Sequence, residues 1–476
     1  MFIGRDRELQ ALEEQYALPG FSMTVIYGRR RVGKTELIKH FIEGKKTIYY
    51  MATKVGAERN LELFSKQLIS VMDPSYEKAA FSNLEDLFDF FTGKLDSTSA
   101  EKLILVIDEL PYWAQRDESL LSVIQKYIDT RWLDKNLFII LCGSALSFMQ
   151  EKVLSEKSPV FGRRSSQIKL AAFDYMKSAE FVLEYSNEEK AICYGVTGGI
   201  AKYLSLIDAD KPLDENIKRL FFRSDGYLYD EPRNLLTQEF MDTALINNII
   251  EVIAAGENTI SLIADKIKEK PQTVIYSIDK LIEVGIVEKK HCITEEKNKK
   301  KTQYVLKDGM FRFWYTFVPK ATSLIEIGRG DVYYDNVVKP RIHAYMGGIF
   351  EEMSRRFTLE QGVTGRFGSF LTDVGTWWGT EMIADEDGKS RPQATDIDVV
   401  AISDIDGTAV IGECKFKSER VGKDVYNTLV RRSHLLSDKY RVTRLILFSL
   451  SGYTDWVKEI KDEQLTCFTL EDMYKR

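Results

Sequence analysis

A glycine-rich stretch near the start of the sequence carries the residue types that bind phosphate. Gly28-Arg29-Arg30-Arg31-Val32-Gly33-Lys34-Thr35 has the spacing of a phosphate-binding loop. Backbone N–H groups of such a loop, and of the helix that follows it, surround a triphosphate. Lys34 can reach the β- and γ-phosphates, and the Thr35 hydroxyl can reach Mg²⁺. We therefore predict that the loop, extended to Glu36, binds ATP and Mg²⁺.

Two acidic residues further along the sequence are suited to hydrolysis. The apolar run 103–107 is typical of a buried parallel strand, and Asp108 and Glu109 follow it directly. Ligands bind at the carboxyl ends of strands in α/β sheets. We predict that Asp108 holds the Mg²⁺ shell and that Glu109 orients or polarises the attacking water. The alternative interpretation is an ordinary acidic turn at the end of a strand.

Ser144 and Arg164 are further candidates for contact with the nucleotide. Ser144 closely follows the apolar run 137–142 and can hydrogen-bond the γ-phosphate or the water, although it can equally be a turn serine. Arg163 and Arg164 follow a predicted loop, and a guanidinium near the γ-phosphate would stabilise transition-state charge. A solvated arginine pair is the alternative. We predict that Ser144 and Arg164 are nucleotide contacts.

A second set of charged residues lies near the end of the sequence. Asp398 and the run Glu413-Cys414-Lys415 fall on two apolar segments that a short turn joins. Alternation puts Glu413 and Lys415 on one face, and a hairpin would bring Asp398 beside Glu413. Two carboxylates can hold Mg²⁺ or Mn²⁺, and a lysine can position the attacking water or steady charge on a phosphate. Glu351, on an upstream helix, is a further candidate acid. The alternative is that this part of the chain has the fold of a metal-dependent enzyme but no catalytic activity.

Alternating apolar runs and helical stretches must position the first set of residues. Strands are predicted at 23–27, 47–51, 103–107 and 137–142, and helices at 61–72, 84–95 and 120–132. This alternation predicts an α/β fold with a parallel sheet and helices on both faces.

The middle of the sequence predicts a winged helix-turn-helix. Three short helices and a hairpin are expected between 240 and 317, with a polar tip at Lys297–Lys301. The outward face of the second helix in the motif would contact the major groove of DNA. Its residues are Gln272, Thr273, Tyr276, Ser277 and Lys280. The alternative is a structural lid or connector.

The length, charge and cysteine content of the chain limit the classes of protein to which it can belong. The 476 residues predict two to four domains, and a net charge of −6 argues against nonspecific coating of nucleic acid. Neither a signal peptide nor an apolar stretch of membrane-spanning length is visible, so we expect no membrane partner. The five cysteines form no C-x-x-C pair, which predicts a reduced, cytoplasmic protein.

The N-terminal motifs together resemble an archaeal-type, AAA-family P-loop ATPase. Phe2–Leu9 resembles the segment that these proteins place against adenine, and Gly198–Leu204 resembles their Gly-Gly-x-Pro-x-Tyr-Leu stretch, with Ala201 in place of proline. The C-terminal charged residues resemble a PD-(D/E)XK nuclease core and the DUF234 region that accompanies these ATPases. The resemblance implies an ATPase domain at 1–235, a winged helix-turn-helix at 240–320 and a nuclease-like α/β domain at 335–476.

We expect a Mg²⁺-dependent ATP hydrolase whose cycle controls DNA binding or cleavage. ATP and DNA are the expected partners, and a homo-oligomer is also considered. The alternative is a nucleotide-controlled DNA-binding or scaffold protein whose nuclease-like domain is inert. A peptide- or protein-remodelling ATPase is a third hypothesis.

Overall fold

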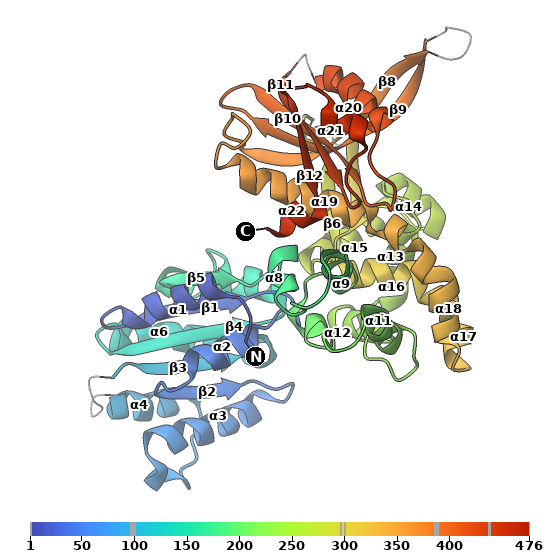
Figure 1. Ribbon diagram of the computed structural model, residues 1–476. Coiled ribbons are helices and arrows are strands. Elements are labelled where there is room, and N and C mark those ends of the chain that lie inside the picture. Colours follow the sequence, from blue (N-terminus) through green and yellow to red (C-terminus); the bar gives the residue numbers. More distant parts are fainter. Residues whose placement is uncertain are drawn as a thin grey trace. The chain divides into compact units, whose positions relative to one another are not determined.

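The chain divides into two compact units in the computed structural model (Figure 1). The first comprises Met1–Phe173 and Ile200–Tyr203, and the second Asp174–Gly199 and Leu204–Arg476. The structure describes residues 2–95, 101–295, 298, 301–384, 390–436 and 439–475. Lys297, Lys299 and Lys300 of the predicted wing tip lie outside these residues. The predicted boundary after residue 235 falls within the second unit.

The first unit is built on a five-stranded parallel sheet with the strand order β2-β3-β4-β1-β5. The strands are β1 (Ser22–Tyr27), β2 (Thr47–Met51), β3 (Leu103–Asp108), β4 (Leu137–Gly143) and β5 (Ser166–Lys169). Every residue of β1, β3 and β4 is buried, as continuous apolar runs predict. The predicted α/β fold with a parallel sheet is confirmed.

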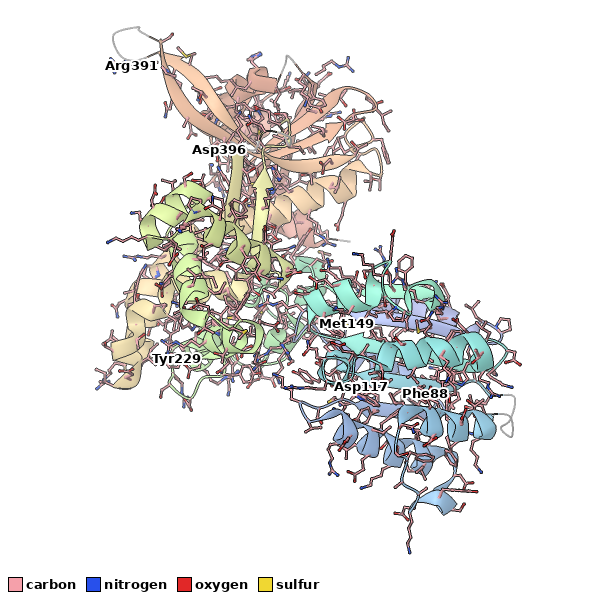
Figure 2. The ribbon with its side chains drawn as sticks, turned by 180° about the vertical axis from the view of Figure 1, so that it is seen from behind. Phe88, Asp117, Met149, Tyr229, Arg391 and Asp396 are labelled. Carbon is pink, nitrogen blue, oxygen red and sulfur yellow. The ribbon has the colours of Figure 1, made fainter. Side chains whose placement is uncertain are left out.

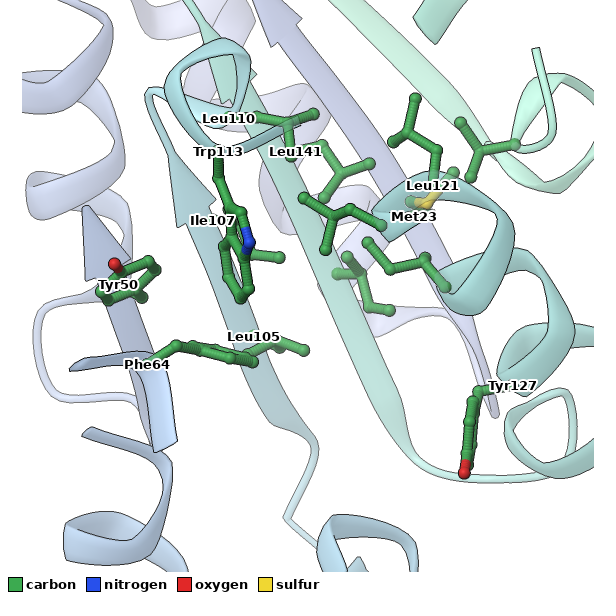
Figure 3. Close-up of a cluster of buried hydrophobic side chains, with 14 of the residues drawn as sticks. Met23, Tyr50, Phe64, Leu105, Ile107, Leu110, Trp113, Leu121, Tyr127 and Leu141 are labelled. Atoms are coloured by element: carbon green, nitrogen blue, oxygen red, sulfur yellow. The ribbon is translucent and has the colours of Figure 1, made fainter. Parts of the chain in front are cut away.

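Helices pack on both faces of this sheet. They are α1 (Asp6–Ala17), α2 (Lys34–Ile42), α3 (Ala57–Met72), α4 (Leu84–Leu95), α5 (Leu110–Ala114), α6 (Leu120–Tyr127) and the short α7 (Leu146–Phe148). Phe41 of α2 packs against Phe138 of β4, with ring centroids 6.0 Å apart. Figure 3 shows Phe64 of α3 beside Leu105 of β3, and Trp113 of α5 beside Ile107 of the same strand. Neighbouring strand residues point to opposite faces, so each face receives its own apolar layer.

The second unit begins with helices and a hairpin. Its helices up to this point are α8 (Tyr175–Ala179), α9 (Asn187–Thr197), α11 (Leu213–Phe221), α12 (Glu231–Glu239), α13 (Thr243–Ala254), α14 (Ile260–Ile267) and α15 (Pro271–Glu283), while α10 (Ala201–Leu204) spans the division. Strands β6 (Val287–His291) and β7 (Thr302–Leu306) pair antiparallel after α15. The expected order of three helices and a hairpin is present, and the winged-helix assignment stays a prediction.

A mixed five-stranded sheet follows, with the order β12-β11-β10-β9-β8. Its strands are β8 (Asp373–Ala384), β9 (Ser390–Ser403), β10 (Thr408–Lys415), β11 (Arg441–Ser449) and β12 (Leu465–Thr469). The helices around it are α16 (Gly309–Phe317), α17 (Thr322–Glu326), α18 (Gly330–Tyr333), α19 (Ile342–Gly362), α20 (Lys423–Ser433), α21 (Asp455–Glu459) and α22 (Leu470–Tyr474). Phe357 of α19 packs on Phe468 of β12, with centroids 4.9 Å apart, whereas Leu429 of α20 joins a separate buried cluster.

The long strands β8 and β9 carry two tryptophans, Arg391 and Asp396. Trp377 and Trp378 lie within the strand β8. Figure 2 shows Arg391 toward the outer end of β9 and Asp396 nearer the body of the sheet. Within the part of the chain that the structure describes, no helix combines the length and apolar character needed to cross a membrane.

Candidate functional site

The phosphate loop connects β1 to α2 in a conformation that requires its glycines. A Cβ atom on Gly28 would lie 2.3 Å from the carbonyl oxygen of Leu170, so no other residue fits there without a backbone shift. Gly33 has a φ of 97° and occupies the left-handed region that glycine tolerates. Arg31 also has a positive φ, 72°, which costs energy in a residue with a side chain. Helix α2 then begins at Lys34, so its first N–H groups face the loop.

The side chain of Lys34 folds back over the phosphate loop. Its Nζ atom donates hydrogen bonds to the carbonyl oxygens of Gly28, at 2.9 Å, and Arg29, at 3.0 Å. Burial lowers the pKa of Lys34, and the nearby carboxylates of Glu109 and Asp108 oppose that change. The residue is 5% exposed. A buried ammonium group is thus available to phosphate oxygens at the loop.

Asp108, the last residue of β3, links the phosphate loop to the neighbouring strand β2. Its Oδ2 atom accepts hydrogen bonds of 2.8 Å from the Thr35 hydroxyl and from the Tyr49 hydroxyl. Its Oδ1 atom accepts from the backbone N–H of Glu109, also at 2.8 Å. Burial, with the Asp108 carboxylate adding to it, raises the pKa of the Tyr49 phenol, so the phenol stays a donor.

The oxygens of Thr35 and Asp108 are a donor set that suits Mg²⁺. Both are hard ligands, and Mg²⁺ is commonly bound by one or two protein oxygens together with substrate phosphates. Among the described residues, no group of three or more His, Cys, Asp or Glu side chains could hold a metal ion. A metal ion at this site would therefore depend on Thr35, Asp108 and the nucleotide.

Glu109 is held by the residue that follows β4. The Ser144 hydroxyl donates to Oε2 of Glu109 over 2.8 Å. Glu109 has a left-handed φ of 50°, an uncommon conformation for a non-glycine residue. Asp108 and Glu109 therefore face different partners, one the phosphate loop and the other Ser144.

The remaining predicted nucleotide contacts have partners of their own. Arg164 donates from Nη1 to the carbonyl oxygen of Leu154 at 3.0 Å and lies over the Phe161 ring. Arg30 donates to the Tyr112 hydroxyl at 3.1 Å. The Val32 carbonyl accepts from Arg5. Glu36 is exposed on α2. The roles of these residues toward a nucleotide stay predictions.

The segment that resembles the Gly-Gly-x-Pro-x-Tyr-Leu stretch returns to the phosphate loop. The backbone N–H of Lys202 donates to the carbonyl oxygen of Arg31 over 3.1 Å. At the N-terminal end, Phe2 stacks on His40 of α2, with ring centroids 4.3 Å apart. Both segments therefore contact elements that form the loop.

A second acidic site lies on β9 and β10. Val399 pairs with Gly412, which puts Asp398 beside Glu413 at the end of the ladder. Oδ2 of Asp398 accepts from the backbone N–H of Cys414 at 2.8 Å, and Oε1 of Glu413 accepts from Lys415 Nζ at 2.7 Å. Burial raises the pKa of Asp398 to about 8, and the carboxylates of Glu413 and Glu351 add to the effect.

Two arginines that the sequence analysis missed complete this site. Arg355 of α19 donates to the Asp398 carbonyl oxygen at 2.8 Å and to Thr376 at 3.0 Å. Arg432 of α20 donates to Oε2 of Glu413 at 3.1 Å. Both come from helices whose sequences show only a helical spacing, so no local signal points to the acids. Asp398 and Glu413 offer hard oxygens that suit Mg²⁺ or Mn²⁺, and their roles stay predictions.

Comparisons with known proteins agree with this organisation. Residues 2–207 match the model of an ATPase domain predominantly from Archaea, and residues 314–425 match DUF234, a region of archaeal and bacterial proteins of unknown function. The Walker-type ATPase PABY2304 of Pyrococcus abyssi has a similar fold, with a TM-score of 0.51 at 22% identity, over 66% of this chain and 96% of that chain.

Relatives in Methanocaldococcus jannaschii are similar in sequence. An uncharacterized ATP-binding protein, MJ0423, is 50% identical over 46 residues, which cover 10% of this chain and 78% of that protein. The uncharacterized protein MJECL04 is 31% identical over 440 residues, which cover 92% of each chain. The chain therefore belongs to the family of MJECL04, archaeal-type P-loop ATPases that carry a DUF234 region after the ATPase domain.

Proposed function

We propose that the first unit hydrolyses ATP with Mg²⁺ and that this cycle controls DNA binding or cleavage by the second unit. The observation that carries the proposal is the 2.8 Å hydrogen bond between the Thr35 hydroxyl and Asp108. It brings together the two oxygen ligands that the phosphate loop and the strand-end acid would offer to a nucleotide-bound Mg²⁺. A homo-oligomer in the cytoplasm, with DNA as its partner, completes the proposal.

The side chains divide the work of hydrolysis. Lys34 and the N–H groups at the start of α2 bind and orient the phosphates. Thr35 and Asp108 would hold Mg²⁺, which supplies neutralising charge to the phosphate oxygens. Glu109 orients the attacking water and accepts its proton, while the hydrogen bond from Ser144 fixes the carboxylate.

ATP turnover by the full chain tests this assignment. Lys34→Ala should abolish turnover, because it removes the buried ammonium group from the phosphate loop. Lys39→Ala is the matched control, since Lys39 lies on the same helix with a side chain 56% exposed. The assignment is wrong if both variants turn over ATP at the wild-type rate. Stimulation of wild-type turnover by DNA would support the proposed control, and its absence would contradict it.

The second acidic site supports metal-dependent cleavage of DNA as the controlled step. Asp398 and Glu413 are each 7% exposed and lie beside the ammonium group of Lys415. Two carboxylates so close together are costly to bury unless a cation compensates them. The carboxylates would hold Mg²⁺ or Mn²⁺, which would supply activation of water toward a phosphodiester, and Lys415 would position that water or steady charge on the phosphate.

A cleavage assay with Mg²⁺ or Mn²⁺ separates an active from an inert domain. Wild-type cleavage should be lost in Asp398→Ala and in Glu413→Ala. Asp396→Ala is the control, since this aspartate lies exposed on the same strand (Figure 2). If wild type retains DNA in an ATP-dependent way but cleaves none, the chain is a nucleotide-controlled DNA-binding or scaffold protein.

A further inference from the structure

A cavity of about 440 Å³ lies entirely within the second unit, apart from the phosphate loop. It is bordered by β6, by α19, by β8 and by aromatic residues of α8 and α9. Its lining includes Lys290, Glu352, Arg355, Tyr194 and Trp378. The volume is in the range of about 300–1,000 Å³ that small-molecule sites occupy.

Positive charge predominates on the walls of this cavity. Four lysine and arginine residues line it, against two glutamates. Arg356 is closely paired with carboxylates outside the lining, Asp174 at 2.7 Å and Glu360 at 2.8 Å. The ion pairs of two other cations are longer, since Lys290 Nζ lies 3.8 Å from the Glu288 carboxylate and Arg355 lies 3.5 Å from Glu351. A concave surface with excess charge of one sign concentrates ligands of the opposite sign. The walls therefore favour an anion.

Lys290 and Arg355 are neighbouring cations in the lining of the cavity. Burial lowers the pKa of Lys290, and the neighbouring Arg355 guanidinium lowers it further. Arg355 is fixed in place because it donates to Thr376 and to the backbone of Asp398. A bound anion would stabilise both cations, because the long ion pairs of Lys290 with Glu288 and of Arg355 with Glu351 compensate them only in part.

Aromatic side chains line the cavity as well. Trp378 of β8 and Tyr194 of α9 both line it, and each is partly exposed. Aromatic faces of this kind bind the planar rings of nucleobases by stacking. A ligand with both a planar ring and a phosphate would use both kinds of wall.

We propose that this cavity binds a nucleoside monophosphate, with the phosphate at Lys290 and Arg355 and the base against Trp378. The proposal goes beyond ATP hydrolysis, because the cavity shares no residue with the phosphate loop. It also places a ligand next to the second acidic site, since Arg355 contacts both the cavity and the backbone of Asp398.

Calorimetric titration of the full chain with UMP tests the proposal. Saturable binding is expected, it should persist in Lys34→Ala, and uridine without phosphate should bind more weakly. Lys290→Met should weaken UMP binding about tenfold, because it removes one charge-assisted contact. Lys270→Met, a change of an exposed lysine ahead of α15, should leave the affinity unchanged.

A second variant guards against loss of binding through misfolding. Glu352→Gln removes a negative charge from the wall and should tighten UMP binding, a result that damage to the fold would not produce. The proposal is overturned if UMP does not bind saturably at millimolar concentration or if Lys34→Ala abolishes binding. Equal affinities in wild type, Lys290→Met and Glu352→Gln would also overturn it.

Discussion

The Ser144 hydroxyl donates a 2.8 Å hydrogen bond to Oε2 of Glu109, although 35 positions separate the two residues. Glu109 directly follows β3, and Ser144 directly follows the neighbouring parallel strand β4. The acid proposed to activate water is therefore positioned by the end of the next strand. Ser144 could thus act by holding the Glu109 carboxylate or by contacting the γ-phosphate directly. Kinetic measurements separate these two roles.

Glu109→Gln should lower kcat for ATP at least about 100-fold, since it removes a general base while preserving the shape of the side chain. ATP binding should persist, because Lys34 and the loop remain. Turnover and nucleotide affinity measured on the same preparation check this prediction. Glu118→Gln, an exposed change in the same unit, is the control. An unchanged kcat in Glu109→Gln would remove this residue from the mechanism.

Ser144→Ala should lower kcat about fivefold with little change in ATP affinity, because one hydrogen bond of about 1 kcal/mol is lost from Glu109. Ser155→Ala is the matched control, since its hydroxyl donates to the backbone carbonyl of Glu151 at an exposed position. Steady-state kinetics give both quantities. A parallel loss of affinity and kcat would instead indicate that Ser144 contacts the nucleotide itself.

Asp398 should make stability depend on pH. Its pKa is raised from 3.8 to about 8, mainly by burial and then by Glu413 and Glu351, whereas the Cys414 N–H and Lys415 oppose the rise. The folded chain thus binds a proton that the unfolded chain releases across this interval, so its free energy of unfolding falls as the pH rises.

Asp398→Asn, which is neutral at every pH, should not show this fall. A chelator is added to remove metal ions. As the pH rises from 3.8 to about 8, the free energy of unfolding of wild type should fall relative to that of Asp398→Asn by at most about 1.4 kcal/mol per pH unit. Denaturant unfolding at several pH values measures the difference, with Asp396→Asn as the control. Parallel pH profiles for wild type and Asp398→Asn would contradict the raised pKa.

Arg432→Met should destabilise the second unit by ~3 kcal/mol, because it removes a cation from two nearly buried acids. Arg432 lies 3.1 Å from Glu413 and 3.9 Å from Glu381, and its side chain is 16% exposed. Arg431→Met should cost less, since that side chain is 50% exposed and contacts Glu381 alone of the two acids. Thermal unfolding of the two variants gives the comparison, and equal losses would show that the acids do not depend on Arg432.

Local patterns predicted the central sheet of the first unit closely. The run expected at 137–142 is the strand Leu137–Gly143, and the run expected at 103–107 lies in the strand Leu103–Asp108. Consecutive apolar residues that are buried on both faces leave a clear pattern. Strand β5 was missed because only Ile168 of its four residues is buried, as is typical of an edge.

The partners of the functional residues could not be predicted in the same way. The Tyr49 hydroxyl bonds Asp108 across 59 positions, and nothing in the run 47–51 distinguishes this tyrosine from its neighbour Tyr50. Arg355 and Arg432 likewise approach the second acidic site from helices far apart in the sequence. Motif spacing identifies groups that act together in one loop, whereas contacts between elements depend on how the sheet and helices assemble.

The contact between Gly28 and Leu170 gives the edge strand β5 an influence on ligand affinity. The Leu170 N–H donates to the carbonyl oxygen of Tyr27, and the Leu170 carbonyl leaves no room for a Cβ on Gly28. A backbone change at residue 170 would thus displace the first glycine of the loop without touching any phosphate ligand. Natural variation at this edge could tune how tightly the chain holds ATP while every motif residue stays the same.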